Sequence, residues 1–336
     1  MSTARQNLAN LLEYVGIESR NYYHAVPAPI QDRSDPLAYY VDFSSRAAYA
    51  GPFDQSGLPL MTDPKNPRPF PTHLAIYALA HLELYRKNQA DENLNRARIC
   101  AEWFKANQQS DGTWLSTFAK KEFGLVAPYR SAMIQGLGIS ALCRMGQVLG
   151  DSKCLDTAMR ALEPFRHDVA DSGVTTYHDA GPFFEEYPCR LPCHVLNGFI
   201  YAMWGLYDLG RSGPLRSRQS ECRDDKHPDL HDFRGNTDAG QLWESGLKTL
   251  IAWLPRYDMG YWSLYHLPES PRNPATVAYH RLHINQLEVM HALTSEPIFK
   301  EYADRWRGYL SHRINALRTL PTKVVWVMSS RSTSSD

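Results

Sequence analysis

Four pairs of segments with helical periodicity dominate the chain between residues 72 and 310. In the first segment, apolar residues recur at Leu74, Ala78 and Leu82, a spacing that predicts one apolar helix face. Thr72 is a candidate N-cap for this helix. The expected pairs are 72–88 with 94–108, 130–150 with 152–166, 194–210 with 240–257, and 283–294 with 297–310. Each hairpin leaves an apolar stripe that only neighbouring hairpins can cover, which predicts an all-α fold, an (α/α) toroid of helical hairpins.

The remaining segments are expected to surround this toroid. Residues 1–71 read as a small N-terminal arm, with a short helix near Ala4–Tyr14, short strands over 39–61 and a Pro-rich loop. The toroid then covers residues 72–320, and residues 321–336 form a tail with a disordered end, because its last residues are mostly serine. The polar stretch between Arg211 and Gln241 predicts a long surface excursion.

The charge balance limits the classes of partner. The 336 residues contain 36 basic and 36 acidic side chains, so no global field attracts nucleic acid or an anionic membrane. No apolar run is long enough to span a bilayer, and the N-terminus lacks an apolar signal region. We therefore expect a cytoplasmic chain with no nucleic-acid partner and no membrane span, and the sequence is compatible with a homodimer.

The cysteines and histidines raise the question of a metal. Cys189 and Cys193 lie four residues apart across a proline, too isolated to complete a zinc site, so free thiols are expected. His280 and His283 have the spacing of two imidazoles on one helix face. Because a carboxylate at ligand spacing is lacking, the simpler expectation is that one histidine caps the helix and the other packs under a ring. No metal is predicted.

The connections between helix pairs carry the candidate chemistry. The stretch "FFEEYPCRLPCHVLNGF" (183–199) places Glu185, Glu186 and Tyr187 just before an apolar helix, either as a solvated turn or as an acid/base pair. The connections "YDMGYWSLYHL" and "ATVAYHRLHINQLEVM" add Tyr265 and Tyr279, which could equally be core tyrosines. The 8 Trp, 19 Tyr and 12 Phe often neighbour Gly, Pro or Asp, a distribution that suits a ring-lined carbohydrate cleft as well as a plain core.

These motifs together resemble the C-terminal catalytic domain of the D-glucuronyl C5-epimerases, which convert glucuronate to iduronate in heparan-type chains. The resemblance runs in family order through roughly residues 70–311. It rests on "WFKANQQSDGTW", "YRSAMIQGLGISAL", "FFEEYPCRLPCHVLNGFIYAMWGLYDL", "LPRYDMGYWSLYHL" and "YHRLHINQLEVM" followed by "PIFKEYADRWRGYL". It implies an (α/α) toroid and a glucuronate-containing polysaccharide as the substrate.

The resemblance also implies roles for individual residues. Glu186 and Tyr279 would transfer protons at C5, and Tyr187 and Tyr265 would hold the uronate. Candidates for further contacts with the substrate, by location, are Glu185, Trp114, Arg130, Gln135, Asn197, Trp262, His280, His283 and Asn285.

The reaction explains why these residue types are needed. Epimerisation removes a proton next to a carboxylate and returns one to the opposite ring face, so two groups must flank the ring. A glutamate or tyrosine can do this if its pKa is shifted toward the working pH, and hydrogen-bond donors must receive the charge that develops. No cofactor is required.

The chain departs from the family pattern in three places. The vertebrate enzymes have Asp-Leu-Arg-His after the tyrosine that corresponds to Tyr265. In this chain the segment that begins with Tyr265 is "YHLPES", so an arginine is missing and Pro268 and Glu269 stand in its place. The connection from Tyr265 to Tyr279 is shorter, and residues 1–71 cannot supply the large N-terminal β region of the animal enzymes.

Two alternatives remain open at this point. A lyase or hydrolase on the same toroid is one, because a lyase begins with the same C5 proton abstraction and differs only in expelling the C4 substituent. A glycan-binding module that has lost the chemistry is the other.

Overall fold

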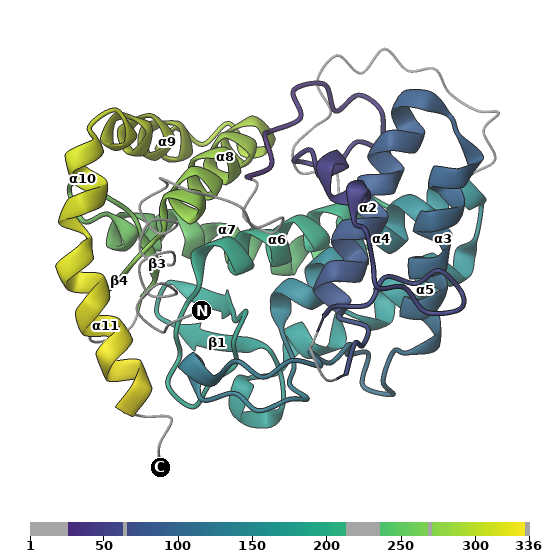
Figure 1. Ribbon diagram of the computed structural model, residues 1–336, viewed down its shortest axis with the longest axis horizontal. Coiled ribbons are helices and arrows are strands. Elements are labelled where there is room, and N and C mark those ends of the chain that lie inside the picture. The colour runs from purple at the N-terminus through teal and green to yellow at the C-terminus, as the bar shows by residue number, and fades with distance from the viewer. Residues whose placement is uncertain (1–25, 63–65, 213–235, 268–270, 333–336) are drawn as a thin grey trace.

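The computed structural model describes residues 26–62, 66–212, 236–267 and 271–332 (Figure 1). Its α-helices are α2 (Pro71–Asn88), α3 (Asp91–Ala106), α4 (Ala132–Leu149), α5 (Ser152–Arg160), α6 (Leu196–Arg211), α7 (Thr237–Trp253), α8 (Val277–Thr294), α9 (Pro297–Leu310), α10 (Arg313–Arg318) and α11 (Leu320–Ser332). The strands are β1 (Thr175–His178), β2 (Gly181–Phe184), β3 (Leu264–His266) and β4 (Asn273–Pro274). The mainly helical class is therefore confirmed.

The four predicted helix pairs form and pack as pairs: α2 with α3, α4 with α5, α6 with α7, and α8 with α9. Thr72 does not cap α2, because Pro71 already occupies the first turn, where its missing N–H removes no helical hydrogen bond, and Phe70 is the N-cap. Thr276 does cap α8, where its Oγ1 accepts a hydrogen bond of 3.2 Å from the Tyr279 backbone N–H.

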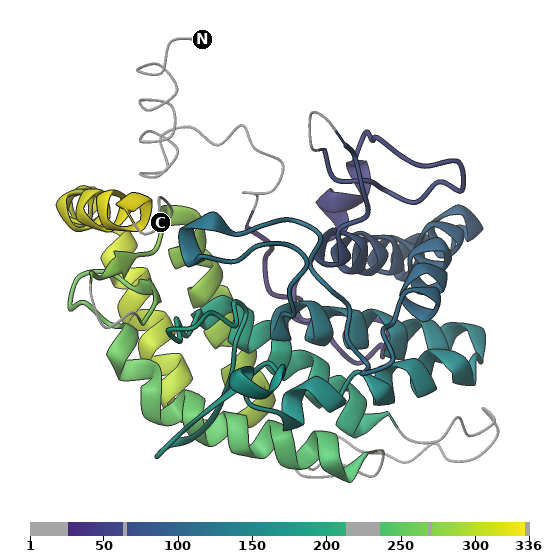
Figure 2. The same ribbon diagram turned by 90° about the horizontal axis from the view of Figure 1, so that it is seen from below.

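One helix of each pair lies on an inner layer. Helices α2, α4, α6 and α8 pack against one another in this order, and α6 is buried along nearly its whole circumference (Figures 1 and 2). Helices α3 and α9 bury a single face. This division follows from composition, since a helix that is apolar all round must be covered on all sides, while an amphipathic helix can face water.

Two glycines allow the closest contact in this inner layer. A Cβ at Gly136 in α4 would lie 2.5 Å from the Ala202 Cα, and one at Gly205 in α6 would lie 2.3 Å from the Gly136 carbonyl oxygen. Helices α4 and α6 therefore touch backbone to backbone, and the loops that precede them are brought together at one end.

The N-terminal arm packs into the helical core. Tyr39, Tyr40 and Phe43 are buried, and the Tyr40 ring lies 4.8 Å from that of Trp204 in α6. The short strands expected over 39–61 are not formed. In the described residues before α2, the extended segments make only isolated bridges, and residues Ser44–Ala48 form the 3₁₀ helix η2.

A buried ion pair joins the arm to two inner helices. Arg144 in α4 binds both oxygens of Asp208 in α6, with Nη1–Oδ2 and Nη2–Oδ1 distances of 2.6 and 3.1 Å. The Tyr40 hydroxyl donates to Asp208 Oδ1 at 2.7 Å, and Arg144 Nη2 also donates to the Ala38 carbonyl oxygen at 3.1 Å. Both charges are thus compensated at a largely buried position, where the two side chains are 6% and 10% exposed.

The C-terminal region differs from the expectation. Residues predicted as a tail with a disordered end are helical up to Ser332, and α11 packs against β4 and the 3₁₀ helix η3 (Lys121–Phe123), at the left edge of Figure 1. Serine has only a modestly lower helix propensity than alanine, and contacts of Trp326 with Phe123 and His266 hold the helix in place. The division at residues 71 and 320 stays a prediction.

Some expectations lie outside the described residues: the helix near Ala4–Tyr14, most of the excursion between Arg211 and Gln241, and the last four residues. In the part of the chain that is described, no helix combines the length and apolar character needed to cross a bilayer.

Candidate active site

The connections that enter the inner helices meet at one end of the inner layer. Glu186 and Tyr187 follow β2 and precede α6, Tyr265 lies on β3, and Tyr279 lies in the first turn of α8. We call Glu186, Tyr187, Tyr265 and Tyr279 the tyrosine cluster. The four residues predicted to be catalytic are thus brought together from three separate connections.

The aromatic rings fix the geometry of this cluster. The Tyr265 and Tyr279 rings meet edge to face with centroids 4.7 Å apart. The Tyr187 ring stacks on Phe123 at 4.5 Å, and Tyr129 lies 6.4 Å from it. Tyr187 and Tyr265 are each 8% exposed, and these ring contacts hold them in place.

Glu186 is a buried carboxyl group in this apolar setting. It is 3% exposed, and burial raises its pKa to about 7, although the Tyr187 hydroxyl and the Lys120 ammonium act in the opposite direction. Its Oε2 receives a long contact of 3.5 Å from Asn197 Nδ2. A carboxyl group with this pKa is populated in both protonation states near neutral pH, as a group that both takes and gives a proton requires.

The three tyrosines, unlike Glu186, stay in one protonation state near neutral pH. Burial, followed by the charge of Glu186, raises the pKa of Tyr187 and Tyr265 well above the usual value and also raises the pKa of Tyr279. Their hydroxyls are therefore protonated at neutral pH and are available as hydrogen-bond or proton donors. The charge of Glu186 is one of the causes of the raised pKa of Tyr279.

Lys120 is a cation of this site that the sequence analysis missed. Its ammonium lies 5.5 Å from the Tyr187 ring centroid and pairs with Glu122 at 2.8 Å. Its side chain is 35% exposed, and Glu122, Tyr279 and Glu186 raise its pKa against the effect of partial burial, so it stays charged. The only sequence signal was a basic dipeptide in the connection from α3 to α4, which has no periodicity and is typical of a surface turn.

Glu185 lies outside the tyrosine cluster, although it precedes Glu186 in the chain. Its oxygens bind the Thr176 hydroxyl at 3.0 Å, the His194 backbone N–H at 3.0 Å and the His194 Nδ1 at 2.6 Å. Glu185 directly follows β2 and Glu186 lies at the bend after it, and the two side chains have different partners. Glu185 instead holds the β1–β2 hairpin against the start of α6.

Trp114 and Gln135 belong to the core beneath the α3–α4 connection. Trp114 is fully buried and donates from Nε1 to the Phe104 carbonyl oxygen at 2.8 Å. The Gln135 amide accepts from the Trp114 backbone N–H at 2.9 Å and donates to the Gly112 carbonyl oxygen at 3.0 Å. The structure leaves neither side chain exposed to stack on or bind a sugar.

Trp262, His280 and His283 form a second buried group. Trp262 stacks on His280 with centroids 3.8 Å apart, and Ser263 Oγ contacts both Nδ1 atoms, at 2.7 Å for His280 and 3.1 Å for His283. Burial lowers the pKa of His280 to about 4 and that of His283 to about 3, so both imidazoles are neutral at pH 7. These candidates for substrate contacts are thus fully buried and uncharged side chains.

Arg130 and Asn285 are also held by other partners. Arg130 Nη2 binds Asp111 Oδ2 at 2.6 Å, and Asn285 Nδ2 donates to the Pro27 carbonyl oxygen at 2.8 Å. Among the hydrogen bonds of the described residues, Asn197 is the predicted binding residue whose side chain reaches Glu186. Pro268 and Glu269, which replace the family's arginine, lie outside the described residues.

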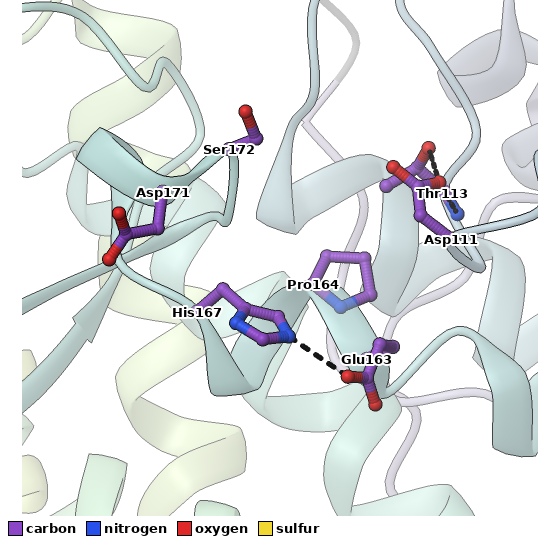
Figure 3. Close-up of a pocket in the computed structure, with 7 residues that line it drawn as sticks. All are labelled: Asp111, Thr113, Glu163, Pro164, His167, Asp171 and Ser172. Atoms are coloured by element: carbon purple, nitrogen blue, oxygen red, sulfur yellow. Dashed lines mark hydrogen bonds and ion pairs between the residues drawn. The ribbon is translucent and has the colours of Figure 1, made fainter.

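A surface pocket of about 280 Å³ is lined in part by Asp111, the residue that binds Arg130 (Figure 3). Asp111 and Thr113 line one side, and Asp171 and Ser172 line the other, with His167 bound to Glu163 at 2.9 Å between them. None of its lining residues belongs to the tyrosine cluster. Within the described residues, no group of three or more His, Cys, Asp or Glu side chains is arranged to hold a metal ion.

His266 is another neighbour that the sequence analysis missed. It is 2% exposed, contacts Tyr265 and Phe123, and neither ring nitrogen has a hydrogen-bond partner among the described residues. Burial lowers its pKa to about 3, so it contributes a neutral imidazole beside the cluster.

Known proteins similar to this chain were identified by sequence and by structure. A D-glucuronyl C5-epimerase of Caenorhabditis elegans is 31% identical over 62% of this chain and 34% of its own length, and an uncharacterized protein of Methanocaldococcus jannaschii is 27% identical over 58% of this chain and 56% of its own length. The unsaturated glucuronyl hydrolase of Bacillus sp. GL1 superposes with a TM-score of 0.43 and 16% identity, covering 71% of this chain and 61% of that chain. The chain thus spans about a third to just over half of the length of the curated relatives it matches. The family model for the C-terminus of D-glucuronyl C5-epimerase matches residues 107–308, and because this range covers more than half of the sequence and contains every residue of the tyrosine cluster, the chain belongs to that family.

Proposed function

We propose that this chain is a uronate C5-epimerase that converts D-glucuronate to L-iduronate within a heparosan or heparan-type polysaccharide. The observation that carries the proposal is the position of Glu186, whose pKa is raised to about 7, among three protonated tyrosines in the family's motifs. The epimerase of Caenorhabditis elegans supports the same reaction class.

The fold proposed for this reaction is an (α/α) toroid. The ordered packing of α2, α4, α6 and α8 as inner helices, each with an outer partner, supports it. In such a ring the inner helices begin at the same rim, which is where the tyrosine cluster lies. The substrate chain would run across this rim.

In the proposed reaction, the Glu186 carboxylate removes the C5 proton from one ring face and the Tyr279 hydroxyl donates a proton to the other face. The reverse reaction exchanges these roles. Because Glu186 is half ionised near pH 7 and Tyr279 is protonated, each group starts in the state that the forward step needs. Tyr187 and Tyr265 would hold the uronate by their hydroxyls.

We assign to Lys120 the stabilisation of the negative charge that develops on the substrate. Removal of the C5 proton places negative charge on the uronate carboxylate, and a cation held nearby stabilises it. Lys120 acts electrostatically on both Glu186 and Tyr279, and its ammonium lies over the Tyr187 ring. It would supply the positive charge that the vertebrate enzymes carry on an arginine, which is missing from the corresponding segment "YHLPES" of this chain.

Incubation with heparosan in deuterated water tests the function. We expect deuterium at C5, formation of iduronate and intact chains. Glu186→Gln should lower iduronate formation by about 100-fold or more, because the replacement has nearly the same shape and cannot take a proton. Absorbance from an unsaturated product would instead identify a lyase, and binding without exchange would identify a glycan-binding module.

A further inference from the structure

The loop between Tyr187 and α6 contains two thiols that face each other. The Cys189 and Cys193 sulfurs are 3.7 Å apart and belong to side chains that are half-buried and 5% exposed, respectively. A disulfide has an S–S length of about 2.05 Å, so a small contraction of the loop would bring the two sulfurs to bonding distance.

Both thiols contact the backbone of Tyr187, a residue of the tyrosine cluster. The Cys189 and Cys193 sulfurs lie 3.0 and 3.6 Å from the Tyr187 carbonyl oxygen, toward which they donate. The Cys193 carbonyl oxygen accepts from the Leu267 N–H at 3.0 Å, and Val195 bridges to His266. The loop therefore connects the backbone of Tyr187 to β3, the strand that carries Tyr265.

We infer that Cys189 and Cys193 form a redox-responsive dithiol whose oxidation to an intramolecular disulfide inactivates the adjacent site. The formation of the disulfide is independent of the proposed function. The predicted loss of epimerase activity rests on the proposed function. The tyrosine cluster works only while the loop keeps its reduced conformation.

The chemistry needs an external disulfide such as oxidised glutathione. The more exposed Cys189, as a thiolate, attacks one glutathione sulfur, and the other glutathione leaves as a thiolate. Cys193, deprotonated in turn, attacks the Cys189 sulfur and releases the second glutathione. Two protein thiols are oxidised to one disulfide, one oxidised glutathione is reduced to two reduced glutathiones, and the two protons pass to the departing thiolates.

Oxidation removes both S–H groups from the Tyr187 carbonyl oxygen and shortens the loop. Tyr187 is stacked on Phe123, so a shift of its backbone must either break this stacking or move the hydroxyl away from Glu186. A displacement of about 1 Å at a catalytic group can lower a rate by about 100-fold.

The experiment equilibrates the full chain with mixtures of reduced and oxidised glutathione, then alkylates it and measures intact and peptide masses. We expect a Cys189–Cys193 disulfide that resists alkylation, at least a tenfold loss of iduronate formation, and recovery of both with dithiothreitol. Hydrogen exchange at residues 187–195 and 264–267 should increase in the oxidised form, a readout that does not depend on activity.

Matched variants complete the test. Cys189→Ser and Cys193→Ser should each stay active under oxidising conditions, whereas Cys143→Ser, which removes a half-buried thiol in α4, should respond as the unchanged chain does. The inference is overturned if both thiols remain alkylatable at high oxidised glutathione, if only mixed glutathione adducts form, or if the disulfide forms without altering hydrogen exchange. A chain that forms the disulfide and shows the exchange change but never makes iduronate would retain the dithiol and refute the proposed function.

Discussion

Gly198 leaves the space that the Glu186 side chain occupies. A Cβ at position 198, in the first turn of α6, would lie 2.3 Å from Glu186 Oε2 and 2.5 Å from Glu186 Cβ. Because both ends of the glutamate side chain would be affected, rotation of the carboxylate alone cannot relieve the overlap. The glycine thus sets the position of the carboxyl group whose pKa is raised to about 7.

Gly198→Ala is expected to displace Glu186 and lower the rate of iduronate formation by about 100-fold, since misplacement of a reacting group by about 1 Å has an effect of this size. The measurement is the turnover rate with heparosan, with circular dichroism to check folding. Gly308→Ala in α9, where a Cβ meets nothing within 4 Å, is the matched control and should keep full activity. Equal rates for the two variants would contradict the positioning role.

The buried Glu186 should also make stability depend on pH. Its folded-state pKa of about 7 exceeds the ordinary value of 4.5, so between these pH values only the unfolded state ionises, and the free energy of unfolding falls as the pH rises. The shift corresponds to about 3 kcal/mol. Glu186→Gln should therefore gain up to about 3 kcal/mol relative to the unchanged chain between pH 4.5 and pH 8, measured by urea unfolding. A difference that does not vary with pH would show that Glu186 has an ordinary pKa.

Tyr279→Phe should separate inversion from exchange. The ring contact with Tyr265 at 4.7 Å is preserved, and only the hydroxyl that donates to the second face is lost. We expect iduronate formation to fall by about 100-fold, while Glu186 still exchanges deuterium into glucuronate with retained configuration. Mass spectrometry and NMR of the digested product measure both quantities. Tyr177→Phe, at a 58% exposed position on β1, is the control. Normal iduronate formation by Tyr279→Phe would exclude Tyr279 as the second acid.

Lys120→Met should weaken stabilisation of the substrate carboxylate. A hydrogen bond to a charged group contributes about 1.5–3 kcal/mol, so kcat/KM for heparosan should fall by roughly 10- to 100-fold. The neighbouring Lys121 is exposed, and Lys121→Met should have little effect at the same ionic strength. If the two variants lose activity equally, the effect is one of general charge rather than of position.

The buried ion pair between Arg144 and Asp208 should matter for stability and not for chemistry. Arg144→Met leaves Asp208 buried without its cation and should cost roughly 3–5 kcal/mol. Arg166→Met, which removes two solvent-exposed pairs, with Glu163 and Asp238, should cost less than about 1 kcal/mol for each pair. The urea midpoints of the two variants measure the difference, and similar midpoints would mean that the Arg144 pair contributes no more than a surface pair.

Much of the helical fold follows from local pattern. The apolar spacing that begins at Leu74 predicts α2 without reference to the rest of the chain, because a helix forms wherever one face can be buried. The motif "EEYPCRLPCHVLNGF" likewise marks Glu186 and Tyr187, since its residue types and order are specific. The residue types alone do not distinguish Glu186 from Glu185, and the resemblance to the family is what assigned the role to Glu186. The separation of the two side chains into two environments depends on how the chain turns after β2.

The sequence by itself determined the helix pairs, the family and the four residues of the tyrosine cluster. Only the tertiary structure decided that Trp114, Gln135 and His280 are buried among other partners, and that Lys120 and the thiols of Cys189 and Cys193 lie beside the cluster. The physical reason is that burial and charge proximity depend on contacts between segments far apart in the chain. A lysine in a turn becomes a cation of the site only when the connection that carries it lies over Tyr187.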